Sequence, residues 1–366
     1  MRQSPKVLFF FLFKEHRIKK VMLMKRIYAL VPCAVVFSMS FVPIMVNAVF
    51  AKTNITDTIH TEPDSSENYP ADNTILIDEN TLQQEITSEK NNTENTDTEK
   101  ISTDFSQTDF EDYITGVVAA EMPALFEPEA LKAQAVAART YAERRMTNGN
   151  SLDTMIENGG QAYCSLDEMK EKWGNNFNEY YDKIKNAVYS TKGEIMVYND
   201  EPILSVFHAI SSGKTETAAN IWSSDEPYLK SVDSSADTTA ENYMSEIRIS
   251  SDNVVSKLQA ARPSLIISSG NLAAQTQIIS RSESGYIQKI QIGNETFTGR
   301  EIREILGLRS SDFSIKQDGN NIIFTTKGYG HGAGMSQYGA NALALEGKNY
   351  HEILSHYYSG IEFKKE

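Results

Sequence analysis

Two prolines divide residues 113–142 into two predicted helices. Pro123 cannot donate a backbone hydrogen bond and disfavours helical geometry at the residue before it, so a helix that begins near Asp109 should end close to Glu121. Pro128 has a backbone conformation that suits the first turn of a second helix. The spacing therefore predicts a carboxyl group at the C-terminal end of one helix, just before another begins.

Glu121 is predicted to hold its proton near neutral pH. The peptide dipoles place partial negative charge at the end of its helix, and Val117, Val118 and Met122 are apolar neighbours, so both effects disfavour the carboxylate. A protonated carboxylic acid at this pH is what general acid catalysis requires. The alternative is a solvent-facing glutamate at a helix end, which would be the favoured assignment for an arbitrary glutamate in this position.

The second helix carries a face of small side chains that allows close approach by a neighbouring element. This face follows the i, i+4, i+7 pattern and comprises Leu131, Ala135, Ala138 and Ala142. Gln134 and Arg139 project from it or beside it. From the residues alone, we expect Arg139 to pair with a carboxylate such as Glu143, one turn further on.

The Tyr-Ile-Thr-Gly-Val-Val-Ala-Ala-Glu-Met-Pro sequence and the alanine-rich helix that follows resemble the SpoIID/LytB family of cell-wall proteins. The resemblance extends over about residues 109–363 and implies one α+β catalytic domain. In that family the glutamate of the Glu-Met-Pro triplet is the catalytic acid of a lytic transglycosylase. The resemblance implies this role for Glu121. It also implies that Arg139 supports the active site by orienting Glu121.

Three further segments are similar to the family. They read Phe-His-Ala-Ile-Ser-Ser-Gly-Lys-Thr-Glu-Thr at 207–217, Pro-Tyr-Leu-Lys-Ser-Val-Asp at 227–233 and Gly-Tyr-Gly-His-Gly-Ala-Gly-Met-Ser-Gln-Tyr-Gly-Ala at 328–340. The resemblance implies that these segments supply the residues that bind substrate, namely His208, Ser212, Lys214, Tyr228, Lys230, His331 and Gln337. Relatives often have Ser-Thr-Ser-Gly-Gly where this chain has Ala-Ile-Ser-Ser-Gly. The resemblance therefore does not fix the conformation of the turn before Lys214.

The residues alone permit other interpretations of these segments. His208 lies in an alternating strand pattern and could be a buried core histidine, while Lys214 and Lys230 could be surface cations. Two nucleotide motifs do not fit: the Gly-Lys-Thr at 213–215 lacks the first glycine of a phosphate loop, and too few residues follow 328–334 for a dinucleotide-binding fold.

The alternating glycines at 328–334 are expected to let the backbone approach a bulky ligand and to let His331 reach into a cleft. Ser336 or its neighbour is expected to cap a helix over residues 338–345.

The chemistry that the resemblance implies needs one carboxyl group. Glycoside hydrolysis normally uses two carboxylates, and the sequence favours only Glu121 as an acid. In a lytic transglycosylase the muramic acid 6-hydroxyl closes on C1, which gives 1,6-anhydromuramic ends. The family acts on glycan strands whose peptides a partner amidase removes, during engulfment of the forespore. Two alternatives remain: a non-enzymatic activator of a cell-wall amidase, and a glycan hydrolase with a second carboxylate.

The N-terminal part predicts a single membrane anchor. Residues 27–51 contain no charged residue, and at about 1.5 Å per residue they could cross a hydrocarbon core of about 30 Å. The basic residues within 1–26 favour a cytoplasmic N-terminus, which leaves the rest of the chain outside the membrane, facing the septal or intermembrane space. The alternative is a signal peptide cleaved near 46–48. We prefer retention because the apolar run is longer than a usual signal core.

Residues 52–108 are predicted to form a disordered acidic linker. The stretch 51–109 contains fourteen Asp or Glu and three Lys but few aromatic residues, so it cannot bury a core. As a flexible coil it would span roughly 40 Å, which would let the domain leave the membrane surface.

Residues 109–366 are predicted to form one α+β domain with mainly antiparallel strands and flanking helices. The strand-like runs are 203–210, 275–281, 286–292 and 321–326. The formal net charge of −14 disfavours nucleic-acid binding, which needs clustered Lys and Arg.

No cofactor, metal site or disulfide is predicted. The chain has two cysteines, Cys33 in the anchor and Cys164 in the domain, which are not placed to pair within one folded chain. Some family members hold zinc near a Gln-Ala-Tyr stretch, but here Cys164 stands alone after that stretch. His351 and His356 fit core packing better than metal binding.

Overall fold

The computed structural model describes residues 107–152, 155, 161–222 and 225–365. In this part of the chain helices combine with mainly antiparallel sheets, as the sequence predicts. The predicted basic N-terminus, the anchor and nearly all of the acidic linker lie outside the described residues. Among the helices that the structure describes, none is both long and apolar enough to span a lipid bilayer.

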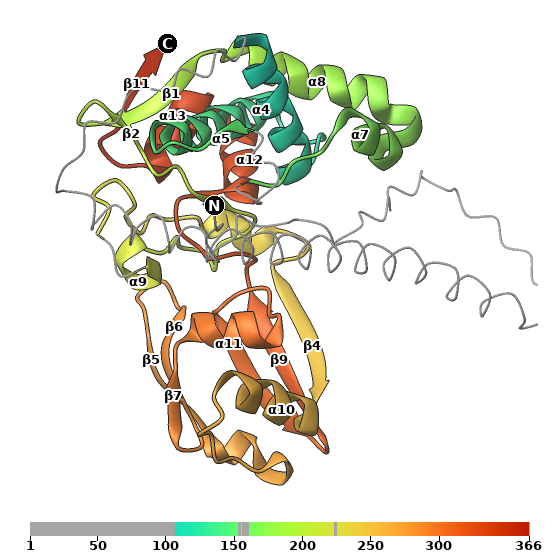
Figure 1. The fold of residues 1–366 in the computed structure, drawn as a ribbon, viewed down its shortest axis with the longest axis vertical. Helices are drawn as coiled ribbons and strands as arrows, with labels where there is room; N and C mark the ends of the chain where they lie inside the picture. The colour runs from blue at the N-terminus through green and yellow to red at the C-terminus, as the bar shows by residue number, and fades with distance from the viewer. Residues whose placement is uncertain (1–106, 153–154, 156–160, 223–224, 366) are drawn as a thin grey trace, which may run out of the picture. The chain divides into compact units, whose positions relative to one another are not determined.

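The two predicted helices at 113–142 are confirmed as α4 (Gln107–Glu121) and α5 (Pro128–Thr147). Pro128 occupies the first turn of α5, as expected. The predicted single packing face of α5 is too narrow a description, because nearly every side chain from Ala130 to Ala142 is buried. Helices α4, α8, α12 and α13 and strand β1 all contact α5, so the alanine-rich helix is the centre of the first hydrophobic core (Figure 1).

The remaining elements of this core come from both ends of the described chain. A three-stranded antiparallel sheet has the order β11-β1-β2, so the last of the described strands pairs with the first of them. The elements are α7 (Leu166–Trp173), α8 (Phe177–Ser190), β1 (Glu194–Tyr198), β2 (Glu201–Pro202), α12 (Gln337–Leu345), α13 (Tyr350–Tyr357) and β11 (Glu362–Lys365).

The predicted strand at 203–210 is wrong in extent. Only β3 (Phe207–His208) is a strand there, and it pairs in parallel with β10 (Met335–Ser336), while β2 ends at Pro202. The apolar run is buried, but its backbone groups find separate partners: Ile203 N–H donates to Met196, and Ile210 N–H donates to Tyr329. Burial alone therefore produced the strand-like pattern.

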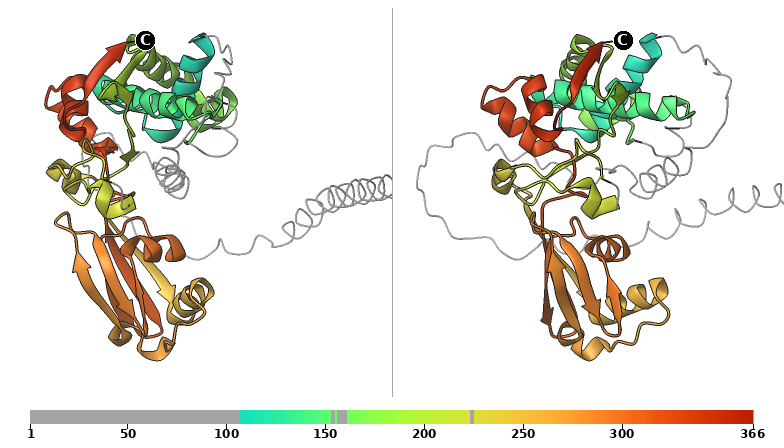
Figure 2. Two further views of the ribbon diagram at one scale, coloured as in Figure 1. Left: turned by 60° about the vertical axis from the view of Figure 1, so that its left-hand side comes forward. Right: turned by 90° about the vertical axis from the view of Figure 1, so that its left-hand side faces the viewer.

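A second hydrophobic core lies between two three-stranded antiparallel sheets, β4-β9-β8 and β5-β6-β7. Helix α10 contacts β4 and β9, and α11 contacts β6 (Figure 2). The predicted strands at 275–281, 286–292 and 321–326 are confirmed as β5, β6 and β9, whereas β4, β7 and β8 were not predicted. The elements are β4 (Met244–Ser250), α10 (Ser251–Ala261), β5 (Thr276–Arg281), β6 (Ile287–Ile292), β7 (Glu295–Phe297), α11 (Gly299–Leu306), β8 (Phe313–Asp318) and β9 (Asn321–Lys327).

Candidate active site

Glu121 is the last residue of α4, and its side chain is buried, with the residue 4% exposed. Its Oε1 accepts a hydrogen bond of 3.2 Å from the backbone N–H of Ala162. Burial raises the pKa of Glu121 to about 8, although hydrogen bonds from Ala162 and Gln337 and the charge of Lys172 each lower it. The carboxyl group is therefore mostly protonated at neutral pH, as the sequence predicts. The main physical cause is desolvation.

Gln337 is the predicted binding residue that the fold brings to Glu121. It is the first residue of α12, directly after Ser336, whose hydroxyl caps the helix by accepting from Gly339 N–H at 3.2 Å. The side chain of Gln337 hydrogen-bonds Glu121, and its Nε2 donates to Oε1 of Gln134 at 3.4 Å. The ends of α4 and α12 and the middle of α5 therefore meet at one buried polar cluster.

Three residues that were not predicted as site residues complete this cluster. The hydroxyl of Tyr113 donates to Oε1 of Gln161 at 3.2 Å. The residue after Gln161 is Ala162, whose backbone N–H donates to Glu121. Lys172 donates to the carbonyl of Ala119 at 3.0 Å, near the end of α4. The only sequence signal for these residues is the Gln-Ala-Tyr stretch at 161–163, which the family resemblance relates to zinc.

Arg139 contacts neither of the carboxylates considered from the sequence. The guanidinium is fully buried and binds Glu111 through Nε–Oε1 at 3.1 Å and Nη2–Oε2 at 2.7 Å. Its remaining donors reach the hydroxyl of Thr191 and the carbonyls of Glu194 and Val188. Arg139 is thus a structural cation paired with a carboxylate, as the residues alone predict, but the partner is Glu111 rather than Glu143, and the pair joins α5 to α4.

His208 and His331 form a second buried cluster. Their ring centroids lie 5.7 Å apart, and the ring of His331 lies 5.2 Å from Trp222. His208 Nδ1 bonds the carbonyl of Ala333 at 2.9 Å and so carries a proton, whereas His331 Nδ1 accepts from the N–H of Ala333 at 3.1 Å. Burial lowers the pKa of each ring to about 3, so both are neutral at physiological pH.

The other four predicted binding residues make their contacts outside the Glu121 cluster. Tyr228 is buried in the hydrophobic core, and its hydroxyl accepts from Leu204 N–H at 3.0 Å. Ser212 is half-buried and bonds the hydroxyl of Tyr286 through its backbone N–H at 3.1 Å. Lys214 and Lys230 are exposed, as the surface-cation interpretation predicted. The structure therefore places Tyr228 in a packing role and leaves both lysines available to solvent.

Comparison with known proteins assigns the family. Residues 98–198 match the family described as stage II sporulation protein, SpoIID. The chain is 40% identical over 261 residues to stage II sporulation protein D of Bacillus subtilis (strain 168), which covers 70% of this chain and 74% of that protein. The chain belongs to the SpoIID family.

Two further relatives extend this result. Stage II sporulation protein D of Bacillus amyloliquefaciens is 40% identical over 267 residues, covering 70% of this chain and 74% of the relative. The amidase enhancer of Bacillus subtilis (strain 168) is 29% identical over 294 residues, covering 68% of this chain but 39% of the enhancer.

The glycine-rich segment of this SpoIID protein packs against protein rather than opening towards a ligand. Gly330 and Gly334 have φ of +115° and +68°. A Cβ at Gly330 would lie 2.6 Å from Cβ of His208, and one at Gly334 would overlap the carbonyl oxygen of Val206. The glycines are required because the segment runs against β3, and His331 is 3% exposed as a result. The expected approach to a bulky ligand is thus replaced by close packing of backbone.

Cys164 of the SpoIID domain is a free, buried thiol. Among the residues that the structure describes, no group of three or more His, Cys, Asp or Glu could hold a metal ion. His356 Nε2 bonds the carbonyl of Asp233 at 2.7 Å, and His351 bonds Glu194. Both histidines therefore hold contacts within the fold, although each remains partly accessible.

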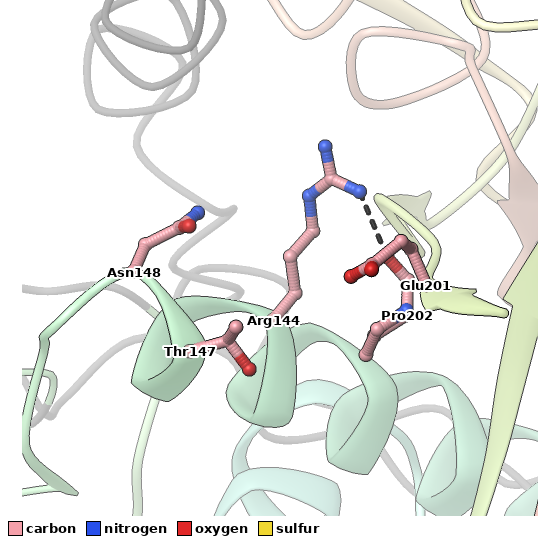
Figure 3. A pocket seen from close by; sticks show the side chains of 5 residues that line it. All are labelled: Arg144, Thr147, Asn148, Glu201 and Pro202. Carbon is pink, nitrogen blue, oxygen red and sulfur yellow. Dashed lines mark hydrogen bonds between the residues drawn. The ribbon is translucent and has the colours of Figure 1, made fainter. Parts of the chain in front are cut away.

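A pocket of about 240 Å³ lies elsewhere on the SpoIID domain, at the end of α5 (Figure 3). Arg144 donates to the carbonyl of Pro202 at 2.8 Å across it. The residues that line it are Arg144, Thr147, Asn148, Glu201 and Pro202. None of them belongs to the Glu121 cluster, so this pocket is separate from the candidate acid.

Proposed function

We propose that this SpoIID-family protein is a lytic transglycosylase that cleaves the bond between N-acetylmuramic acid and N-acetylglucosamine in peptide-free glycan strands. The observation that carries the proposal is the buried carboxyl group of Glu121, whose pKa is raised to about 8. A group that holds its proton at neutral pH and can still lose it is suited to act first as an acid and then as a base.

Both proton transfers are assigned to Glu121. The carboxyl group donates its proton to the glycosidic oxygen as the bond between C1 and that oxygen breaks. The resulting carboxylate then takes the proton of the muramic acid 6-hydroxyl as the bond from O6 to C1 forms. The carboxyl group is thereby regenerated and no water is consumed.

A second carboxylate is not needed for this reaction. The groups that shift its pKa in the described part of the chain are Ala162, Gln337 and Lys172, so the one formal charge among them is positive. An inverting or retaining hydrolase would need a partner carboxyl group about 5–9.5 Å away. Lys172 lowers the pKa of Glu121 and would stabilise the carboxylate that forms midway.

Burial of Glu121 sets a condition on this function. A glycan can reach a side chain that is 4% exposed only if the cluster around it opens locally. Since water is then displaced by substrate, the raised pKa can persist in the complex.

The second candidate is a glycan-binding activator of an amidase, without catalysis. Two observations favour it: the relative named as an amidase enhancer, and the closed surroundings of Glu121. An activator would need the glycan contacts but not the proton transfer.

We further propose a cellular setting for this activity. A retained anchor at 27–51 would hold the domain outside the cell membrane, and a cell-wall amidase would supply strands without stem peptides during engulfment. Fractionation of sporulating cells would test this setting, because release of a soluble protein would contradict a retained anchor.

The decisive experiment is a mass measurement of reaction products. The full chain and its Glu121→Gln variant are incubated with peptide-free glycan strands. We expect 1,6-anhydromuramic ends from the unaltered chain and a loss of at least about a hundredfold in rate in the variant, the usual effect of removing an acid–base group. Reducing ends would indicate a hydrolase. Binding without any cleavage would indicate the activator.

A further inference from the structure

Two amide groups beside Glu121 are buried with unused hydrogen-bond donors. Nε2 of Gln134 and Nε2 of Gln161 have no hydrogen-bond partner among the described residues. Both residues are almost fully buried, at 0% and 2% exposure. Their Oε1 atoms are occupied, by Gln337 and by the Tyr113 hydroxyl respectively. Each amide is therefore oriented by its oxygen and has free N–H groups.

These donors belong to the same cluster as the candidate acid. Gln134 bonds Gln337, which bonds Glu121, and Gln161 is followed by Ala162, whose N–H also bonds Glu121. Buried amide donors without acceptors are unfavourable in a folded protein. Two of them beside one catalytic candidate indicate a place where a ligand supplies the acceptors.

The chemistry of the missing partner follows from the donors. The unsatisfied atoms are the amide nitrogens, so a ligand that satisfies them must present acceptors. An ammonium group could not do so, because it carries donors and no acceptor. The neighbours on the same face of α5, Ala130 and Ala138, are small, apolar and fully buried, so an apolar end of the ligand would meet methyl groups there.

We propose that Gln134 and Gln161 are specificity residues that donate hydrogen bonds to the acetamido carbonyl oxygens of the glycan, with the acetamido methyl group against the small residues of α5. The identity of the glycan rests on the proposed function. The acetamido group is the part of an amino sugar that combines a carbonyl acceptor with an apolar end. A plain hydroxyl group offers an acceptor but no methyl group.

The test compares peptide-free strands that carry all their acetyl groups with the same strands after chemical removal of those groups. Rates of cleavage and affinities are measured for the full chain, for Gln134→Met and for Gln161→Met. Methionine keeps the length of the side chain and removes only the amide. Lys132→Met is the matched control, because Lys132 lies on the same helix and pairs with Glu129 near the surface.

We expect the unaltered chain to prefer the acetylated strands. Each glutamine variant should lose about tenfold in kcat/KM on acetylated strands and little on deacetylated ones, so the preference falls. Lys132→Met should keep the full preference. Each variant also removes an amide oxygen that accepts a hydrogen bond, from Gln337 or from Tyr113, so a small fall in melting temperature is expected and the assignment is judged from the ratio of rates on the two kinds of strand.

Two outcomes would overturn the assignment: an equal loss on both kinds of strand, or no loss on either. Either result would indicate amides held by internal water or needed only for folding. If anhydro ends appear equally from both kinds of strand, the proposed function survives and the specificity assignment fails. If acetylated strands bind preferentially, through both glutamines, without being cut, the specificity assignment survives and the enzymatic function fails.

Discussion

Arg139 and Glu111 are joined by two parallel hydrogen bonds between α5 and α4, and both side chains are about 1% exposed. Glu111 also accepts from the backbone N–H of Gly193 at 3.1 Å, just before β1. The pair thus connects three elements. Since Glu121 ends the helix that carries Glu111, this contact helps to set the position of the candidate acid.

The first prediction concerns this ion pair. Arg139→Met leaves the Glu111 carboxylate buried without its partner, so the free energy of unfolding should fall by about 3–5 kcal/mol. Urea denaturation measures the change. The double variant Arg139→Met with Glu111→Leu should recover most of the loss, because both charges are then absent. An unchanged stability together with a large drop in kcat would instead assign Arg139 a direct role in the chemistry.

The second prediction concerns the alkaline side of the activity profile. Because the proposed reaction begins with a protonated Glu121, kcat/KM should fall as pH rises through about 8. The hydrogen bond from Gln337 lowers the pKa of Glu121, so Gln337→Met should move this fall to higher pH. Initial rates of anhydro-end formation between pH 5 and pH 10, at fixed ionic strength, give both curves. A fall that stays in place, or moves to lower pH, would contradict the assigned contact.

The third prediction concerns stability at high pH. In the folded state the pKa of Glu121 is raised from 4.5 to about 8, so the folded protein binds more protons than the unfolded chain between these values. The stabilising contribution is complete below about pH 4.5 and is lost as pH rises through 8. Glu121→Gln should remove this dependence, so between pH 4.5 and pH 8 its stability relative to the unaltered chain should rise by about 4 kcal/mol. Thermal unfolding across pH 5–9 shows whether the two curves diverge.

The fourth prediction concerns acid. The pKa values of His208 and His331 are lowered from 6.5 to about 3, so the unfolded chain binds more protons than the folded protein between these values. The stability that depends on these two neutral rings is fully present above about pH 6.5 and is lost as pH falls towards 3. His208→Asn keeps a donor for the Ala333 carbonyl but does not titrate, so its stability should decline less steeply in acid. Denaturation curves of both proteins at pH 4 and pH 7 measure the difference. If both proteins lose the same stability between pH 7 and pH 4, the two rings are not buried in the neutral form.

The fifth prediction compares two glycines with positive φ. In Gly334→Ala the new Cβ overlaps the carbonyl of Val206, whereas in Gly347→Ala the Cβ meets nothing within 4 Å. Gly347→Ala should cost about 1 kcal/mol for its backbone conformation alone. Gly334→Ala should cost about 3 kcal/mol or more, because backbone must move. Equal costs, measured by thermal unfolding, would mean that the segment at 328–334 is not held against β3.

Local rules predicted the helix ends around the candidate acid well. A proline two residues after Glu121 and another at position 128 act through the backbone geometry of their own neighbourhood, so the ends of α4 and the start of α5 could be placed without any knowledge of distant residues. The cap at Ser336 was predictable for the same reason. The strand run at 203–210 failed because burial gives the same apolar pattern whether or not a continuous ladder forms.

Side-chain partners required the tertiary structure. Arg139 lies 28 residues from Glu111 in sequence, and Gln337 lies 203 residues from Gln134, so helical spacing could not suggest either pair. The same holds for the unpaired N–H groups of Gln134 and Gln161, since an unused donor exists only relative to everything that surrounds it. Tyr228 was placed in a cleft from a motif, whereas its hydroxyl is committed to Leu204 in the core.

The sequence by itself determined that a carboxyl group stands at a helix end, between two prolines and among apolar neighbours, and that it should resist ionisation. Only the tertiary structure decided how strongly, because the shift comes mainly from the removal of water when the carboxyl group is buried. Proline geometry acts over one turn of backbone, whereas desolvation depends on every element that packs against the group. The acid was therefore visible in the sequence, and the amides beside it became visible only in the fold.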